Sequence, residues 1–424
     1  MAKVLSVNSA SLSRAFSFSH GWQYTLGVLF IAQVLSAVGH SMMFPFLPLY
    51  IDSLGSAGGF STELLAGLVL SAQGITMMIV APVWGALADR FGRKKMIMRA
   101  LFGGAITLAL MGIVQNAEQL IFVRAAQGLL TGTVSANNAL IAAAAPRHRV
   151  GFAMGTLQVG LWAGVAVGPL LGGVLADLFG YTLPFFITAL LLLSGGLVVL
   201  LGVNEDFSAH QTQGKLRAAA IVRNWKSILQ TSGVGCVLLI RFQSSLARTI
   251  IMPIAPLFVV SLIANDAATN NTYAGLIMAV SAATSTFGAV YLGHLGDRIS
   301  HRKVLFYCAA AATALYVPQA FVADVWQLLF LQGLVGIAAG GLVAAPSALL
   351  SRYTRKDTAG AVYGMDNSAM AGSRAVAPLV GASIALMFGM RGTFIAAALV
   401  FAFIAITALY LLPSDKLESA KHRH

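Results

Sequence analysis

The sequence predicts an all-α polytopic membrane protein with twelve transmembrane helices arranged as two six-helix bundles. Of its 424 residues, 58% are hydrophobic and only 10% are charged, whereas a soluble domain carries roughly 25% charged residues. Apolar runs of about 20 residues, the length that crosses a bilayer as a helix, recur along the whole chain. The second half also repeats features of the first, so the expected total is two copies of a six-helix unit.

The repeat is visible as glycine and proline residues that return after 208 or 209 positions. The matched pairs are Gly128 and Gly336, Gly132 and Gly340, Gly155 and Gly364, Pro169 and Pro378, and Gly172 and Gly381. A polar stretch of mixed charge separates the two copies and is predicted to be a linker. The predicted segments are a cytoplasmic N-terminus at 1–23, a first bundle at 24–203, the linker at 204–230, a second bundle at 231–412 and a cytoplasmic tail at 413–424.

The individual spans follow from apolar runs that end at charged residues, glycine or proline. The first run contains Pro45 and Pro48 near its outer end, where we expect a break or kink because proline removes a backbone donor. The expected spans are Tyr24–Ile51, Leu64–Ala88, Met96–Val114, Gln119–Ala144, Gly151–Ala176, Leu183–Val203, Gly233–Ile263, Thr272–Gly296, Val304–Val322, Trp326–Ser351, Ala359–Met387 and Thr393–Leu412.

The net charge of +13 reports topology rather than a nucleic-acid partner. We place 22 of the 27 Lys and Arg residues in the termini and the turns on one side of the membrane, and one, Arg391, on the other side. This bias predicts an inner (plasma) membrane protein with both termini in the cytoplasm. Cys236 and Cys308 fall inside spans, so we expect neither a disulfide framework nor a metal site.

A short basic turn joins the second and third spans at Gly85–Lys95, with the sequence GALADRFGRKK. Its two glycines permit a sharp turn and close helix packing. A weaker copy, GHLGDRISHRK, follows 208 residues later at Gly293–Lys303. The residues of this pattern are Gly85, Asp89, Arg90, Gly92, Arg93 and Lys94, with Asp297 and Arg298 in the copy.

The fifth span carries glycine at every fourth position, so one face has no side chains and another helix can approach its backbone. Pro169 adds a kink within this face. A glycine seam of this kind occurs in many polytopic proteins, so a purely structural role is one interpretation. The residues of the seam and its motif are Gly160, Gly164, Gly168, Pro169, Gly172 and Gly173.

Away from their first turns, the predicted spans contain four arginines and one carboxylate; Arg99, in the first turn of the third span, is counted with the basic residues of the cytoplasmic side. A cation in the membrane costs at least about 2.5–3.5 kcal/mol, so these residues should face water, one another or a ligand. A structural reading is an ion pair between Asp366 and an arginine. The functional reading is a central cavity with surplus positive charge, which favours anionic or zwitterionic cargo. The candidates for the cavity are His40, Arg241, Arg248, Asp366 and Arg374, while Arg124 lies in the fourth span.

Four stretches, Phe44–Tyr50, Gly85–Lys95, Arg124–Gly128 and Gly164–Gly173, together resemble the drug:proton antiporters with twelve spans in the major facilitator superfamily, which include multidrug and tetracycline exporters. The resemblance covers essentially the whole chain. It implies export of a small amphiphilic molecule against an inward flow of protons, as two bundles rock about a central site.

The resemblance also implies roles for individual residues. Asp89 and Arg93 would belong to a cytoplasmic gate, the fifth-span motif would seal or bend during the cycle, and Arg124 would take part in proton coupling. Asp366 and His40 are further candidates for the proton, since both titrate. Several relatives carry an acidic residue in the first span; here that span offers only His40. The energy source would be the proton gradient, with no cofactor, and we expect a monomer.

Other functions stay open at this point. The arginine surplus also suits a dedicated exporter of an endogenous metabolite, such as a carboxylate siderophore. The fifth-span motif disfavours an importer, and a membrane sensor that transports nothing is a remote alternative. The chain contains no HExxH, no GxSxG and no phosphate-binding glycine loop, so we do not expect an enzyme.

Overall fold

The computed structural model describes residues 16–17, 21–146, 149–207, 233–263, 269–354 and 359–412. The predicted tail at 413–424, most of the N-terminal segment and the linker from residue 208 onwards lie outside these ranges. Two short strands, β1 (Phe16–Ser17) and β2 (Asp206–Phe207), pair antiparallel.

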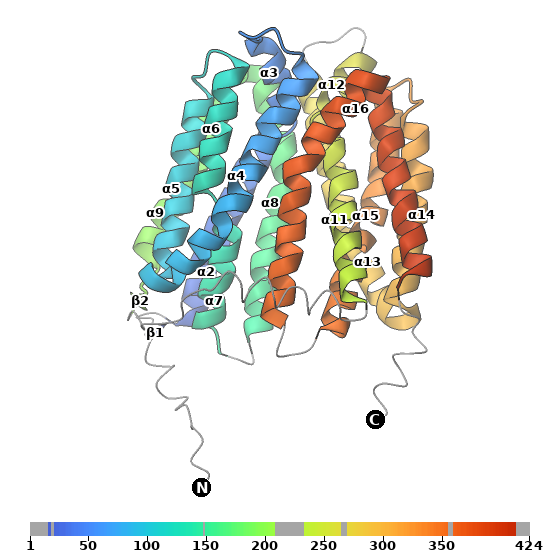
Figure 1. The fold of residues 1–424 in the computed structure, drawn as a ribbon. Helices are drawn as coiled ribbons and strands as arrows, with labels where there is room; N and C mark the ends of the chain where they lie inside the picture. Colours follow the sequence, from blue (N-terminus) through green and yellow to red (C-terminus); the bar gives the residue numbers. More distant parts are fainter. Residues whose placement is uncertain are drawn as a thin grey trace.

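The first half of the chain folds into one bundle and the second half into another, and Figure 1 shows the two bundles side by side. The first bundle contains α2 (Trp22–Met42), α3 (Leu47–Leu54), α4 (Thr62–Phe91), α5 (Arg93–Met111), α6 (Ala117–Leu130), α7 (Thr133–Ala144), α8 (Val150–Phe179) and α9 (Thr182–Gly202). The second contains α11 (Val234–Ile250), α12 (Ala255–Leu262), α13 (Asn270–Ile299), α14 (His301–Gln319), α15 (Val325–Tyr353) and α16 (Ala359–Tyr410).

Twelve membrane crossings are present in the described chain, as the sequence predicts. Eight segments are long and apolar enough to cross a bilayer by length and composition alone. The last of these, Gly364–Tyr410, holds two helices that meet at Gly389, where the backbone is not helical. The other three crossings are α5, α14 and the pair formed by α6 and α7.

The repeat predicted from the sequence is confirmed by the helix boundaries. The helix α13 begins and ends 208 residues after α4, and α14 begins and ends 208 residues after α5. The aromatic packing is repeated as well. The rings of Tyr50 and Phe185 lie 5.1 Å apart in the first bundle, and those of Phe258 and Phe394 lie 5.0 Å apart in the second.

The structure breaks two spans that the sequence reading treats as continuous, the fourth and the seventh. The fourth divides into α6 and α7 at Thr131 and Gly132, where Gly132 has a φ of 133° that is open mainly to glycine. The seventh divides into α11 and α12 around Pro253, as the first divides around Pro45. Proline lacks the backbone donor that a continuous helix needs.

The two bundles meet through backbone contacts at glycine. A β-carbon on Gly67 of α4 would lie 2.9 Å from the carbonyl oxygen of Pro378 on α16. The equivalent contact joins Gly275 of α13 to the carbonyl oxygen of Pro169 on α8. Because these positions are related by the repeat, the two helix pairs form one pseudo-symmetric interface.

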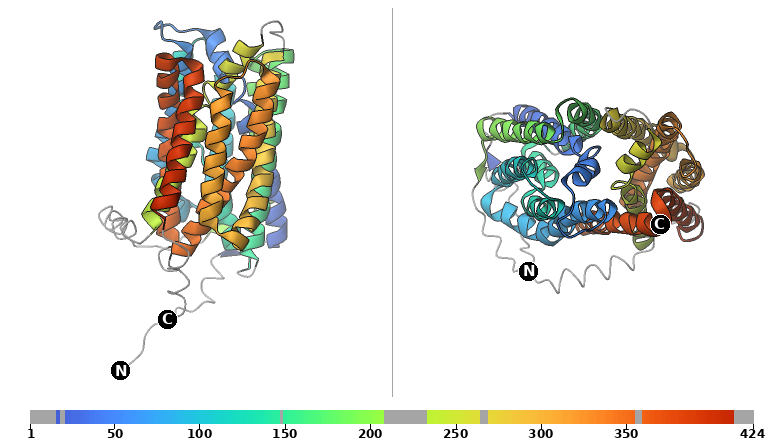
Figure 2. Two further views of the ribbon diagram at one scale, coloured as in Figure 1. Left: turned by 90° about the vertical axis from the view of Figure 1, so that its right-hand side faces the viewer. Right: turned by 90° about the horizontal axis from the view of Figure 1, so that it is seen from above.

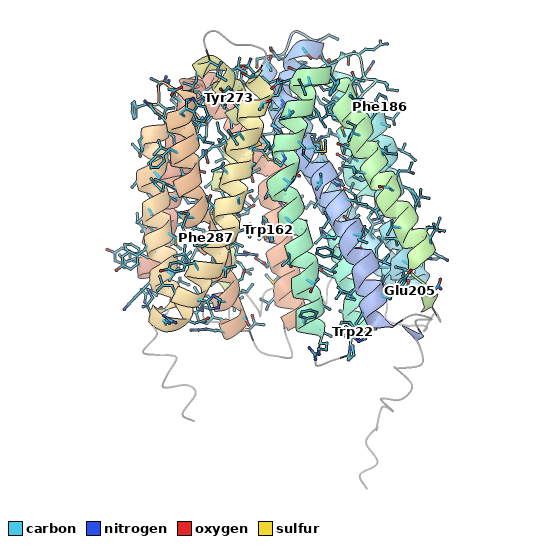
Figure 3. All side chains as sticks on the ribbon, turned by 180° about the vertical axis from the view of Figure 1, so that it is seen from behind. Trp22, Trp162, Phe186, Glu205, Tyr273 and Phe287 are labelled. Carbon is cyan, nitrogen blue, oxygen red and sulfur yellow. The ribbon has the colours of Figure 1, made fainter. Side chains whose placement is uncertain are left out.

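These contacts lie toward one end of the molecule. We call the end with the turns at Gly92 and Ser300 the basic end, and the other end the opposite end. Gly67 and Gly275 lie in the first third of α4 and α13, near the opposite end. Figure 3 shows α8 and α13 together near Tyr273 and apart toward Trp22, and the view from above in Figure 2 separates the two groups of helices.

A loop at the opposite end is held by Glu118. Its carboxylate accepts hydrogen bonds from the Ser56 hydroxyl at 2.7 Å and from the backbone N–H of Gly58 at 3.0 Å. These bonds lower the pKa of Glu118 to about 2, because they favour the ionised form. The connection between α3 and α4 is thereby tied to the start of α6.

The turn at Ser300 carries a strained backbone. Ser300 has a φ of 140°, and it is the only residue other than glycine with a positive φ in the described chain. Its equivalent in the first bundle is Gly92, with a φ of 95°. A residue with a side chain in such a conformation costs about 1–3 kcal/mol. The Ser300 hydroxyl also accepts a hydrogen bond from the Arg302 N–H at 3.2 Å.

We therefore expect Ser300→Gly to stabilise the protein by about 1 kcal/mol, since replacing a capping serine by glycine costs only a few tenths of a kcal/mol. Unfolding by denaturant in mixed micelles measures the change. Gly92→Ser is the matched control and should destabilise the protein. A lower stability for Ser300→Gly would contradict the strain.

Candidate functional site

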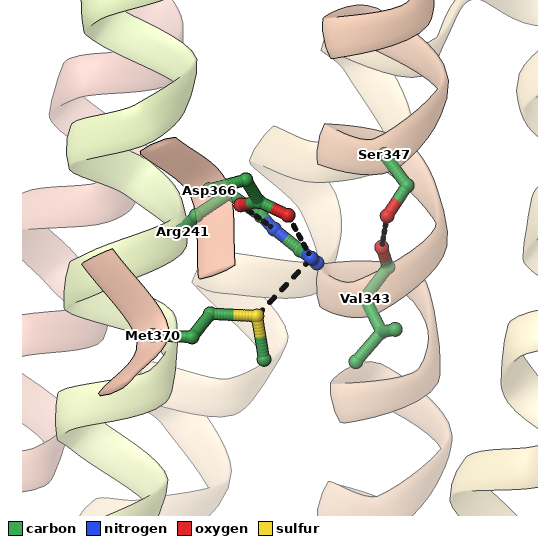
Figure 4. A network of polar contacts seen from close by, with 5 residues as sticks. All are labelled: Arg241, Val343, Ser347, Asp366 and Met370. Carbon is green, nitrogen blue, oxygen red and sulfur yellow. Dashed lines mark hydrogen bonds and ion pairs between the residues drawn. The ribbon is translucent and has the colours of Figure 1, made fainter. Parts of the chain in front are cut away.

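The helices α11 and α16 are joined by an ion pair between Arg241 and Asp366. The Arg241 Nε donates to Asp366 Oδ1 and its Nη2 donates to Oδ2, both at 2.7 Å. The Nη2 group also lies 3.2 Å from the Met370 sulfur (Figure 4). The two side chains are 12% and 8% exposed. This two-bond geometry is the strongest form of arginine–carboxylate recognition, and it matches the structural reading of Asp366.

Two further arginines lie near this pair without a carboxylate of their own. Arg248, two turns along α11, is partly exposed, and in the described part of the chain its Nε donates to the backbone carbonyl of Ser244 at 3.1 Å. Arg374 on α16 is exposed, although its neighbours Ser373 and Ala375 are buried. Within the described residues, neither arginine forms an ion pair.

The three arginines form one positive cluster. Arg248 lies close enough to Arg241 and Arg374 for their charges to interact. Asp366 neutralises one of these charges and leaves two. The backbone at Arg374 packs against Gly74 of α4, which belongs to the first bundle. The cluster therefore belongs to the second bundle and lies beside the interface between the bundles.

The exposure of Arg374 indicates where the cluster faces. Its position is the middle of the first helix within α16, and a cation exposed to lipid at that depth is costly. Water between the bundles is the lower-energy environment. Two open hollows of the described structure, of about 510 and 280 Å³, lie elsewhere, beside Trp22 and beside Phe321. The central cavity stays a prediction.

Arg124 lies apart from this cluster, inside the first bundle. It is fully buried, and its Nη1 donates to Gln127 Oε1 at 2.7 Å and contacts the Met43 sulfur at 3.5 Å. Its Nε and Nη2 groups are buried without a partner in the described chain. No carboxylate of the described residues pairs with it. A buried cation in this condition is expensive to maintain, which is typical of functional residues.

His40, on α2, lies near Arg124, which is on α6. Its Nδ1 lies 2.9 Å from the carbonyl oxygen of Ser36. A carbonyl only accepts, so we assign the proton of the neutral ring to Nδ1, and Nε2 is then free to take up a second proton. The imidazole is partly exposed. His40 and Arg124 therefore form a second polar group, separate from Asp366.

The glycine face of α8 lies against α2 of the same bundle. Gly164 meets the backbone and side chain of Ala37, and Gly172 meets the carbonyl of Met42. Gly173 points instead to the other bundle, where it meets the carbonyl oxygen of Asn271 on α13. Of the predicted motif, Gly164, Gly168 and Gly172 pack within the bundle, while Pro169 and Gly173 lie at the interface between the bundles.

The basic turn of the first bundle is anchored by a carboxylate that the sequence reading did not select. Glu205, just after α9, accepts from the backbone N–H groups of Arg93 and Lys94 at 3.2 and 2.7 Å. Both donors lie in the first turn of α5, where a negative charge is favourable. The side chains of Asp89 and Arg90, and the surroundings of Gly85, lie outside the described part of the structure.

The second copy of the turn uses different chemistry. Asp297 accepts from His301 Nε2 at 3.0 Å and lies 3.6 Å from Arg352 Nη2. His301 is the equivalent of Arg93 by position. Arg298 is exposed. Among the described residues, Asp297 makes its ion pairs within the second bundle.

Two other polar contacts escaped the sequence reading. Arg99 of α5 stacks on the Trp84 ring at 3.5 Å and contacts the Thr131 carbonyl at 3.4 Å. Asp177 of α8 accepts four hydrogen bonds from Asn271 and Thr272 of α13. Arg99 was counted with the cytoplasmic basic residues, and a lone aspartate at a helix end has no distinctive sequence pattern.

These features define the class of protein. The chain belongs to the major facilitator superfamily: the model of this family matches residues 29–242 and again 237–424. It is a transporter with many membrane spans, and the fold of two repeated bundles predicted from the sequence is confirmed.

Individual relatives and a solved structure are similar to this chain over most of its length. The chain is 37% identical to the multidrug resistance protein MdtG of Enterobacter lignolyticus over 385 residues, 91% of each protein. It is 36% identical to MdtG of Serratia proteamaculans over 394 residues, 92% of this chain and 94% of the relative. Among solved structures, the nucleoside transporter NupG (D323A mutant) has the same fold, with a TM-score of 0.77 at 14% identity over 92% of this chain and all of that chain.

We expect the Arg241–Asp366 pair to be strongly coupled in stability. Asp366→Leu leaves Arg241 without a counter-charge, and Arg241→Leu leaves Asp366 alone, so each should cost about 3 kcal/mol. The double variant removes both charges and should recover most of this loss. Denaturant unfolding of the three variants gives the coupling energy. Simple addition of the two losses would show that the pair contributes little.

Proposed function

We propose that this protein exports small amphiphilic molecules, drugs among them, across the inner membrane in exchange for protons. The observation that carries the proposal is the pair of uncompensated arginines, Arg248 and Arg374, beside the interface of the two bundles. The likeness over nine-tenths of the chain to proteins named for multidrug resistance supports the direction of transport. Antibiotic resistance is then one expected phenotype.

The charge of the cluster supports anionic or zwitterionic cargo. Asp366 is occupied by Arg241, so two positive charges remain for a substrate carboxylate or phosphonate. Arginine binds such groups through two parallel hydrogen bonds. The same surplus supports a second candidate, an exporter dedicated to one acidic metabolite such as a carboxylate siderophore.

The proton pathway in this proposal uses residues of both bundles. No described residue bonds to the Nε2 of His40, and the ring lies near the buried charge of Arg124, so its protonation responds to any movement of that charge. Asp366 is the carboxylate of the proposed pathway, and in this state it is held by Arg241. The proposed orientation places the basic end in the cytoplasm, as the distribution of Lys and Arg predicts.

Substrate movement is proposed to follow alternating access by rocking of the bundles. The contacts between the bundles at Gly67 and Gly275 lie toward the opposite end, and α8 and α13 separate toward the basic end (Figure 3). This arrangement corresponds to the cytoplasm-facing state of such a cycle. A monomer contains both bundles and is sufficient for the mechanism.

We expect Arg248→Gln to weaken the binding of anionic substrates at least tenfold more than that of cationic ones, because a charge-assisted hydrogen bond is worth about 1.5–3 kcal/mol. Uptake into everted vesicles under an imposed pH gradient measures both classes. Arg298→Gln is the matched control, since Arg298 is exposed outside the cluster. Equal losses for anions and cations would contradict the proposed cargo.

We also expect His40→Asn to reduce the pH dependence of export, since asparagine keeps a donor for the Ser36 carbonyl but cannot titrate. The matched control is His294→Asn, because the Nδ1 of His294 lies 2.8 Å from the carbonyl oxygen of Val290 in the same local geometry. A pH profile unchanged in His40→Asn would remove His40 from the coupling step.

A further inference from the structure

The end of α8 carries a carboxylate that reaches across to the other bundle. Asp177 Oδ1 accepts from the backbone N–H of Asn271 at 3.2 Å and from its side-chain Nδ2 at 2.7 Å. Asp177 Oδ2 accepts from the backbone N–H of Thr272 at 2.7 Å and from its hydroxyl at 2.6 Å. One side chain of the first bundle thus receives four hydrogen bonds from the second.

These donors are the start of a long helix. The helix α13 begins at Asn270, and its N-cap residue Thr269 provides no side-chain cap. The N–H groups of Asn271 and Thr272 are the ones that a helix usually satisfies with its own capping residue. Asp177 therefore serves as the N-terminal cap of α13, although it belongs to the other bundle. The helix dipole adds to the attraction for a negative charge.

The position of this contact is at the closed end of the interface. Gly173, one turn before Asp177, meets the carbonyl oxygen of Asn271. Asn271 is buried. The repeat supplies no second copy: the position equivalent to Asp177 is Leu386 on α16, and it is 49% exposed. Only the α8–α13 side of the interface has this carboxylate contact among the described residues.

We propose that Asp177 is a latch that holds the opposite end of the transporter closed, and that its four hydrogen bonds break each time the bundles open there. This rests on the proposed alternating access. In that cycle Asp177 is a positioning residue that sets the equilibrium between the two states, since it acts through α13 and touches no substrate. When the bundles separate, α13 loses its cap and Asp177 must find water instead.

The test measures the opening of this end directly, without a transport assay. Gln115 and Ala323 are exposed residues at the opposite end of the first and second bundle respectively. Spin labels are attached to Gln115→Cys and Ala323→Cys in a chain with Cys236→Ala and Cys308→Ala, reconstituted in lipid nanodiscs. The distance distribution from pulsed electron resonance then gives the ratio of open to closed molecules.

Asp177→Asn should raise the ratio of open to closed molecules about tenfold, equivalent to about 1.4 kcal/mol. The amide offers one acceptor oxygen in place of two and carries no charge. Thr272→Val removes a single donor from the other side of the contact and should shift the ratio in the same direction, about threefold. A misfolded variant is recognised by size-exclusion chromatography, because it does not elute as a single species.

The matched control is Asp52→Asn. Asp52 is also a carboxylate at the opposite end, but its bond to the Thr62 hydroxyl at 2.7 Å stays within the first bundle. Asp52→Asn should leave the ratio of open to closed molecules unchanged. Gly173→Trp is the positive control, because a large side chain there collides with α13 and should hold this end open.

The outcomes separate the latch from the transport cycle. If Gly173→Trp opens the end while Asp177→Asn and Thr272→Val behave like the parent chain, the latch is overturned and alternating access stands. If Asp52→Asn opens the end as far as Asp177→Asn does, loss of charge at this end explains the effect and the latch is also overturned. If no variant produces a longer distance, the two-state transport proposal fails, and the latch with it.

Discussion

The arrangement of the whole molecule depends on backbone contact between the two bundles at glycine. Gly67 and Gly275 place α4 against α16 and α8 against α13 so closely that a side chain at either position would collide with a proline carbonyl. Such contacts leave few side chains to interlock and offer no polar bonds of their own. Small residues let two helices approach to backbone contact, and the attraction between the helices is then mainly van der Waals packing.

The interior charges are divided unequally between the bundles. In the second bundle, Arg241 is paired with Asp366 while Arg248 and Arg374 stay unpaired beside the interface. In the first bundle, Arg124 is buried, and its partners among the described residues are Gln127 and Met43. The described parts of the two bundles therefore differ in chemistry: the second holds three arginines and one carboxylate beside the interface, and the first holds a buried arginine near His40.

The sequence was sufficient to predict the twelve spans, the repeat and the positions of the interior arginines, because these depend on long apolar runs and rare charges. It did not reveal the break at Gly132, since a single threonine–glycine pair in an apolar run is common. The partners of Glu205 and Asp177 were also missed. Each binds backbone N–H groups of a distant helix, and a backbone donor leaves no mark in the sequence. Whether Arg248 or Arg374 meets a substrate stays a prediction.

The repeat equivalent of Asp177 is Leu386, which has no carboxylate, and this difference affects how the two sides of the interface are held together. The two halves of the interface are built from equivalent helices, yet among the described residues only the α8–α13 side has the four hydrogen bonds of Asp177, while α4 and α16 pack through glycine at Gly67 and Gly74. Separation at that end then meets unequal resistance on its two sides. The two sides of the interface are therefore mechanically unequal, because the polar contact lies on the α8–α13 side.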